Sequence, residues 1–251
     1  YKQYPHFPVP GNHDSYCNSF LEYNELYVLP VLTENGGIAS KTRDYYSFDY
    51  GNVHIIGYNS HLDALLDVGT PFYKWLQNDL DNFDAERTAG QKKWCIVFTH
   101  YPAHTHGSHN SDSTAGDDIQ MTHNRTRINP LLETYNVDLV IYGHSHCYER
   151  SYFMKGFFGN ASAFNTSYVT QTGVGDNTSG NPYYNKSSGQ LGTVYITNGW
   201  GGASQSTSGT WPHAANVRYQ TGVYGSIIID FSALSGSNQT MRVRALGGTG
   251  G

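Results

Sequence analysis

The sequence has 251 residues, of which 14% are charged and 14% aromatic, and its formal net charge is −5. A chain of this length can bury a substantial core, so we expect 1–251 to form a single domain. Because the net charge is negative and no long basic run occurs, we expect neither nucleic acid nor a membrane surface as a partner. No apolar run approaches the length of a transmembrane helix, which argues against a membrane-spanning protein.

Sequons for N-glycosylation are frequent, and together with many Tyr, Gly, Ser and Thr residues they are typical of a secreted, extracellular glycoprotein. They stand at Asn124, Asn160, Asn165, Asn177, Asn185 and Asn238. A chain rich in Asn, Ser and Thr also produces such sequons by chance. Four of them fall in 153–190, a stretch rich in Gly, Ser, Tyr and Asn that predicts a loop region or an insertion.

The sequence contains three cysteines, Cys17, Cys95 and Cys147. The number is odd, so at least one of them lacks a partner within the chain. Cys95 lies in an apolar run and is typical of a core residue. For Cys147 the sequence leaves packing, a disulfide and metal ligation open.

In the first part of the chain, the stretch P-V-P-G-N-H-D over 8–14 ends an apolar segment at Gly11 and then presents an amide, an imidazole and a carboxylate. Aromatic residues on one stripe predict a helix over 18–27. Strands over 45–50 and 53–58 flank Gly51-Asn52 and indicate a hairpin. Thr70 as N-cap and Pro71 at the first position predict the start of a helix over 71–82.

In the second part, the apolar stretch over 94–99 predicts a buried strand, followed by His100 and a polar loop with His104, His106 and His109. A helix over about 125–135 leads to V-D-L-V-I-Y at 137–142, which predicts another buried strand. The order strand, loop, helix, strand indicates an α/β fold with a layered core.

After the strand at 137–142 we expect Gly143 to turn the chain and to present His144 and His146. In an extended backbone these positions point to the same side, where two imidazoles suit a metal ion. An H-x-H pair on its own is also compatible with ordinary surface or core histidines.

Three motifs occur together: G-N-H-D at 11–14, F-T-H-Y-P at 98–102 and G-H-S-H-C-Y-E-R-S at 143–151. In order and spacing they resemble the calcineurin-like metallophosphoesterases, and the Y-E-R-S ending resembles the purple acid phosphatase branch. The resemblance covers about 8–152, and G-T-V-Y-I-T-N-G-W-G-G at 192–202 resembles the strand and glycine turn that close the second sheet of the family. It implies a four-layer αββα sandwich.

The resemblance also implies site roles and a dinuclear metal centre of Fe with Zn, Mn or Fe. Asn12, His100 and His144 would bind the divalent metal, and His146 would bind the other ion, typically ferric iron. As catalytic, substrate-binding residues, His13 would contact the phosphate and protonate the leaving group, and His109 would face the substrate. Asn110 stands where plant relatives carry a second histidine, so substrate preference does not transfer. Asp14 or Glu149 would accept from a ligand imidazole or form an ordinary ion pair, with Arg150 for example.

The family carries D-x-H or D-x-x and then G-D-x-x-Y or G-D-x-x-D before G-N-H-D, and their aspartates bind and bridge the metals; the chain has neither motif. We therefore expect the carboxyl-terminal two-thirds of a phosphoesterase domain that lacks its first strands, with an incomplete second metal site. Residues 1–251 alone are expected to have negligible activity, and preceding chain, a separate fragment or a neighbouring subunit would supply or cover the absent strands. Two functions stay open: hydrolysis of small phosphate esters, or a catalytically inactive structural or interaction protein on the same scaffold.

Overall fold

The computed structural model describes residues 3–16, 18–186, 190–232 and 239–248, and it divides the chain into two compact units, Tyr1–His100 and Tyr101–Gly251. Cys17 and the Asn238 sequon lie outside the described residues. Within the described ranges, none of the helices has the length and apolar character needed to cross a bilayer. Both units combine helices with strands, as expected for an α/β protein.

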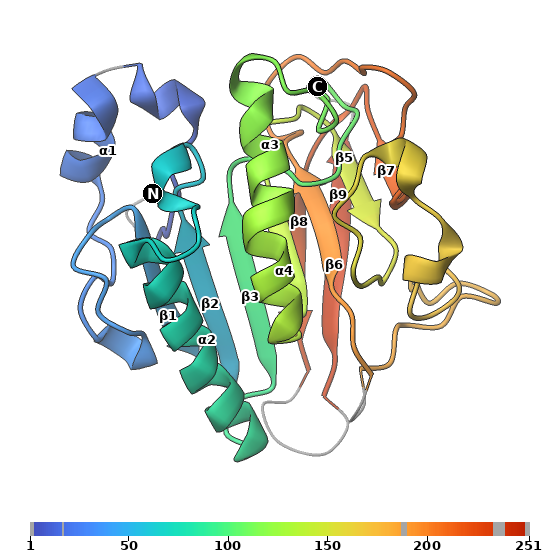
Figure 1. Ribbon diagram of the computed structural model, residues 1–251. Helices are drawn as coiled ribbons and strands as arrows, with labels where there is room; N and C mark the ends of the chain where they lie inside the picture. The colour runs from blue at the N-terminus through green and yellow to red at the C-terminus, as the bar shows by residue number, and fades with distance from the viewer. Residues whose placement is uncertain (1–2, 17, 187–189, 233–238, 249–251) are drawn as a thin grey trace. The chain divides into compact units, whose positions relative to one another are not determined.

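The strands of the first unit have the bounds that the sequence predicts: β1 (Tyr45–Tyr50), β2 (Val53–Tyr58) and β3 (Trp94–Thr99) (Figure 1). β1 and β2 form the expected antiparallel hairpin, and β3 pairs with β2 in parallel. Gly51 has a φ of 59°, which the tight turn of the hairpin requires and which glycine adopts without strain. The parallel pair brings residues after β2 and after β3 to the same edge of the sheet.

Helix α2 (Pro71–Thr88) begins where predicted, because the Thr70 side chain caps it by accepting a hydrogen bond from the Tyr73 N–H at 3.1 Å. It continues beyond 82, where the prediction ended, because buried Phe83 extends its apolar stripe and stacks on His54. The single helix predicted over 18–27 was wrong. A 3-10 turn (Asn18–Phe20) precedes α1 (Leu21–Leu26), and φ values of 52° at Ser19 and 69° at Phe20 break the helical path.

Both faces of the β1–β2 hairpin are covered. On one face, Tyr45 and Tyr58 pack against Phe72 and Trp75 of α2. On the other face lies a cluster of Phe20, Tyr23, Leu29, Tyr46 and Phe48. Further 3-10 turns occur at Asn12–Ser15, Glu34–Gly36 and Asp63–Leu65. The two covered faces explain why the strand sequences are almost continuously apolar or aromatic.

In the second unit, four of the described strands pair in the order β4-β6-β5-β7: β4 (Leu139–Tyr142), β5 (Tyr148–Ser151), β6 (Val194–Asn198) and β7 (Asn216–Gln220). β4 and β6 are parallel, whereas β5 is antiparallel to both β6 and β7. β8 (Tyr224–Phe231) and β9 (Met241–Gly248) form a separate antiparallel hairpin. The strand predicted over 137–142 therefore begins at Leu139, and β6 lies within the stretch 192–202.

Trp200 links the two sheets of this unit. Its ring stacks on Tyr148 of β5 at 4.9 Å between centroids, and its carbonyl accepts the N–H of Gly225 in β8 at 3.0 Å. A Cβ at Gly225 would lie 2.6 Å from the indole, so glycine is needed there for the close approach.

One continuous helical segment covers part of the second unit (Figure 1): a 3-10 turn (Gly116–Asp118), α3 (Ile119–His123), a π-helical turn (Asn124–Ile128) and α4 (Asn129–Thr134). The prediction of 125–135 found only its second half. Pro130 lacks an N–H, which favours the irregular turn before it. α4 is held to the sheet because Tyr142 of β4 donates to Asn129 at 3.0 Å and Tyr195 of β6 donates to Glu133 at 2.6 Å. The described residues of 153–190 contain only short 3-10 turns, Ala161–Ala163 and Thr166–Tyr168, and isolated bridges.

Candidate functional site

In the first unit, the structure brings Asn12 and His100 together. Asn12 starts the 3-10 turn after Gly11, and His100 directly follows β3. His100 Nε2 lies 2.9 Å from Asn12 Oδ1, within hydrogen-bond distance. A Cβ added to Gly11 would lie 2.6 to 2.9 Å from atoms of the His100 ring. The glycine of G-N-H-D is thus the residue that allows the imidazole to reach the Asn12 amide.

The two residues after Asn12 differ in their surroundings. His13 is exposed and meets the Tyr16 ring edge-on at 4.9 Å between centroids. Asp14 accepts the backbone N–H of Gly11 at 2.8 Å and so fixes the turn. The sequence suggested that Asp14 accepts from a ligand imidazole or forms an ion pair. The contact that the structure gives Asp14 is instead to a backbone N–H.

In the second unit, His144 has a left-handed backbone, with a φ of 61°. The turn was expected at Gly143, but the strained angle falls on the histidine instead. Strain of this kind at a non-glycine residue is common in functional sites. Ser145 N–H donates to Gly143 O at 2.7 Å and Cys147 N–H to Ser145 O at 2.8 Å, so the H-x-H segment is a series of tight turns. The extended backbone assumed for His144 and His146 was therefore wrong.

His109, Asp118 and His144 nevertheless converge in this unit. The ring centroids of His109 and His144 are 3.8 Å apart. Asp118 Oδ1 lies 2.9 Å from His109 Nδ1 and 3.9 Å from His144 Nε2. These three side chains can each offer one ligand atom within 4.8 Å of the others. Sequence reasoning missed Asp118, because nothing in G-D-D at 116–118 distinguishes it from a helix start on the surface.

His146 is close to the same group, with its ring centroid 6.4 Å from that of His109. Its Nδ1–H donates to the Ser204 carbonyl at 3.1 Å, and its backbone N–H donates to Ser108 Oγ at 2.8 Å. With Nδ1 carrying the proton, the Nε2 lone pair of the neutral ring is available as a ligand.

Glu149 has neither of the roles considered for it. It is buried and accepts from the Thr105 hydroxyl and from the His213 backbone N–H, the latter at 3.0 Å. Arg150 donates to the Val174 carbonyl at 2.7 Å instead. Burial raises the pKa of Glu149 above its usual range. Cys147 is a buried free thiol 3.5 Å from Glu149, and burial followed by this neighbouring charge raises its pKa, so a reactive thiolate is disfavoured.

The residues present fit a centre that binds hard or borderline metal ions. The 2.9 Å between Asn12 Oδ1 and His100 Nε2 is close to the roughly 3 Å between neighbouring ligands of an octahedral ion, each about 2.1 Å from it. Neutral amide oxygen and imidazole nitrogen suit Zn, Mn or Fe. His100 and His144 belong to different units, so their shared ligation of one ion stays a prediction.

Comparisons with known proteins agree with these motifs. The family model of the calcineurin-like phosphoesterases matches residues 1–148. Purple acid phosphatase 18 of Arabidopsis thaliana is 33% identical over 152 residues, 59% of this chain and 31% of that protein. Acid phosphatase type 7 of Danio rerio is 27% identical over 157 residues, 58% of this chain and 33% of that protein.

Among solved structures, that of purple acid phosphatase PPD1 from yellow lupin (Lupinus luteus) seeds is similar with a TM-score of 0.60 at 20% identity. The match covers 94% of this chain and 35% of the lupin chain. At this identity the likeness shows a shared fold. The matches cover about a third of the length of each of these relatives.

Proposed function

The chain belongs to the calcineurin-like phosphoesterase family, and from this membership we propose that the protein hydrolyses phosphate esters in the manner of an acid phosphatase. The α/β metallophosphoesterase fold expected from the motifs is confirmed. The observation that carries the proposal is the convergence of His109, His144 and Asp118 in the second unit, and the Asn12–His100 contact within the first unit adds a second motif pair. A small phosphate ester is the substrate class that such a site suits.

The family implies a dinuclear metal centre, and we assign Asn12, His100, His144 and His146 as its ligands in this chain. When bound, two cations neutralise the phosphate charge and lower the pKa of a water molecule for attack on phosphorus. Iron paired with zinc, manganese or iron is the metal content proposed here. The neutral Asn and His donors hold the ions without cancelling their positive charge, which favours an anionic substrate.

The remaining polar side chains act on the substrate directly. Exposed His13, next to Asn12, contacts the phosphate and delivers a proton to the departing alkoxide. Asp118 holds the Nδ1–H of His109, so Nε2 is the ring nitrogen that meets the phosphate. Asp118 is thus a positioning residue for His109.

We also propose a secreted, glycosylated protein. Asn160, Asn165, Asn177 and Asn185 are all exposed, as N-glycosylation requires. Asn124 is buried and its amide donates to the Tyr101 carbonyl at 2.7 Å, so this sequon does not suit a glycan.

The test is hydrolysis of p-nitrophenyl phosphate by the complete natural protein, supplied with iron, zinc or manganese, together with metal analysis of the purified protein. We expect metal-dependent turnover and at least two metals per chain. His144→Ala should lose both turnover and metal, because it removes a ligand. A protein that binds no metal and shows no turnover would instead be a catalytically inactive scaffold protein.

A further inference from the structure

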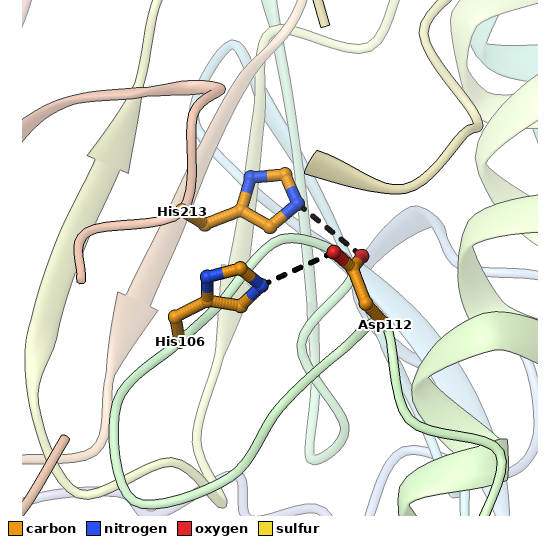
Figure 2. Close-up of side chains that lie close together, drawn as sticks. All are labelled: His106, Asp112 and His213. Atoms are coloured by element: carbon orange, nitrogen blue, oxygen red, sulfur yellow. Dashed lines mark hydrogen bonds and ion pairs between the residues drawn. The ribbon is translucent and has the colours of Figure 1, made fainter. Parts of the chain in front are cut away.

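The second unit contains another histidine cluster, distinct from the residues assigned to phosphate hydrolysis (Figure 2). His106 and Asp112 come from the loop after β3, and His213 comes from the loop before β7. His106 Nε2 is 3.2 Å from Asp112 Oδ2, and His213 Nε2 is 3.7 Å from Asp112 Oδ1. Each of the three side chains offers one ligand atom within 4.8 Å of the others.

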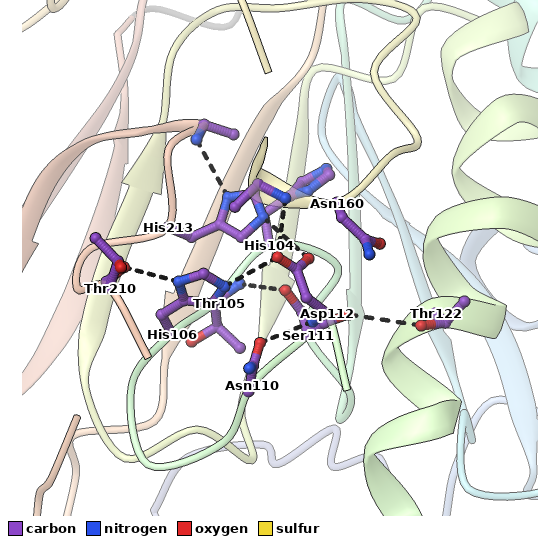
Figure 3. Close-up of polar contacts among 12 residues, drawn as sticks. His104, Thr105, His106, Asn110, Ser111, Asp112, Thr122, Asn160, Thr210 and His213 are labelled. Atoms are coloured by element: carbon purple, nitrogen blue, oxygen red, sulfur yellow. Dashed lines mark hydrogen bonds and ion pairs between the residues drawn. The ribbon is translucent and has the colours of Figure 1, made fainter. Parts of the chain in front are cut away.

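Several polar atoms of this cluster are buried without a hydrogen-bond partner among the residues the structure describes: Asp112 Oδ1, His213 Nε2 and both ring nitrogens of His104. His104 is 3% exposed, and its ring centroid is 5.3 Å from that of His213 (Figure 3). Leaving a polar group buried and unpaired costs about 1–3 kcal/mol. These atoms lie close together, so they are positioned to share a ligand.

The surroundings orient two of the three side chains toward that ligand. His106 Nδ1–H donates to the Thr210 carbonyl at 2.7 Å, so Nε2, which faces Asp112, is the ring nitrogen that can bind an ion once it has lost its proton (Figure 3). A histidine that binds metal through one nitrogen usually donates the other N–H in this way. The backbone N–H of Ala161 donates to Asp112 Oδ2 at 2.9 Å and holds the carboxylate in place.

We propose that His106, Asp112 and His213 bind a divalent transition-metal ion, with Zn²⁺ the best match. Two imidazoles and one carboxylate are a donor set that zinc favours. Ligands about 2.1 Å from a tetrahedral ion lie about 3.4 Å from one another. The Asp112 carboxylate lies 3.2 Å from His106 Nε2 through Oδ2 and 3.7 Å from His213 Nε2 through Oδ1, on either side of that value. The ion would fasten the loop around His106 to the loop around His213.

Two neighbouring groups, the Arg125 guanidinium and the Ala215 N–H, work against binding of the ion. Arg125 Nη1 lies 3.7 Å from Asp112 Oδ1, and its positive charge lowers the affinity for a cation. The Ala215 N–H donates to His213 Nδ1 at 3.1 Å, so the metal-free neutral ring carries its proton on Nε2. Zinc takes the Nε2 lone pair, so the proton moves to Nδ1 and the Ala215 contact opens.

Zinc binding should depend on pH. An imidazole binds zinc only through a ring nitrogen that carries no proton, so protonation of His106 or His213 competes with the ion. Affinity for zinc should therefore fall as the pH falls.

The His213 tautomer can be read directly in the unmodified protein. Long-range ¹H–¹⁵N spectra of the complete natural protein labelled at histidine should show His213 protonated at Nε2 before zinc is added and at Nδ1 afterwards. Loss of the Nε2 proton with a ligand-type ¹⁵N shift supports the site. A His213 spectrum that zinc leaves unchanged would overturn it, because the cluster would then be an ion pair of His106 and Asp112 beside a neutral His213.

Metal counting supplies an independent measurement that does not depend on catalysis. His106→Gln and Asp112→Asn should each lower the zinc content of zinc-loaded protein by one ion per chain. Asp230→Asn is the matched control, because Asp230 is an exposed carboxylate paired with Arg244. Equal zinc content in all of these proteins would also overturn the proposal.

Discussion

The His109 and His144 rings lie with centroids 3.8 Å apart and planes inclined by 31°, while Asp118 holds the first ring through a 2.9 Å contact to Nδ1. One ring comes from the loop after β3 and the other from the tight turns after β4. Asp118, at the start of the long helical segment, therefore fixes the orientation of His109, which we propose to face the substrate, beside a proposed metal ligand.

Replacing Asp118 tests this positioning role. Asp118→Asn should lower kcat by about 10- to 100-fold, as for other groups that orient residues at metal sites. Asp117→Asn is the matched control, because Asp117 is the exposed neighbour. Steady-state kinetics of both variants provides the measurement. Equal kcat values for the two variants would contradict the positioning role.

Gly11 should not tolerate a side chain. In Gly11→Ala the new Cβ would lie 2.6 Å from His100 Cε1, so the ring must move away from Asn12. We expect metal affinity to fall and kcat/KM to decrease by about 10- to 100-fold, because small displacements of reacting groups are costly. Gly248→Ala is the control, since no atom lies within 4 Å of the added Cβ. Normal activity of Gly11→Ala would show that the His100 position is not critical.

A buried charge cluster in the first unit should make stability depend on pH. His54 lies between two carboxylates, with Nδ1 2.8 Å from Asp49 and Nε2 2.9 Å from Asp79. Burial by itself lowers its pKa, but the hydrogen bonds and charges of these aspartates raise the pKa from 6.5 to about 9. The protonated ring thus joins β1, β2 and α2.

Because the folded-state pKa of His54 is the higher one, its stabilisation is complete below about pH 6.5 and is lost as the pH rises through about 9. The loss should be on the order of 3 kcal/mol, at about 1.4 kcal/mol per pKa unit. Denaturant unfolding at several pH values, with His54→Gln alongside, measures it. The free energies of unfolding of the two proteins should converge above pH 9, and a constant difference would refute this account.

Glycosylation should distinguish the sequons by burial. In a secreting eukaryotic host we expect glycans at several of the exposed Asn160, Asn165, Asn177 and Asn185, and none at the buried Asn124. Intact-mass measurement before and after deglycosylation, followed by peptide mapping, tests this. An unchanged mass, or a glycan at Asn124 in folded protein, would contradict the prediction.

The strands were predictable because their signal is local. Tyr45–Tyr50, Val53–Tyr58 and Trp94–Thr99 have the predicted bounds, since apolar runs next to turn residues define them without reference to distant parts of the chain. The predicted helix bounds were wrong where the backbone departs from a regular α-helix in spite of a helical pattern of apolar residues. The left-handed Ser19 and Phe20 split one helix, and a π-helical turn joins two others.

Candidate site residues could be named from the sequence where a motif contains them, and residues that only folding brings next to them were missed. Asn12, His100, His109 and His144 come from the motifs or their fixed spacing. Asp118 and His213 reach their partners through tertiary structure, as His213 lies 3.7 Å from Asp112 although about a hundred residues separate them. Contacts between such distant positions leave no periodic or spacing signal in a single sequence.

The buried position of Trp200 affects its fluorescence. The indole is 2% exposed, donates through Nε1–H to Asn198 at 2.8 Å, and lies against glycines of both strands of the β8–β9 hairpin. If the hairpin separated from the sheet, water would reach this ring and shift its emission to longer wavelength. Trp200 is thus an intrinsic fluorophore that reports whether the last hairpin of the chain is docked.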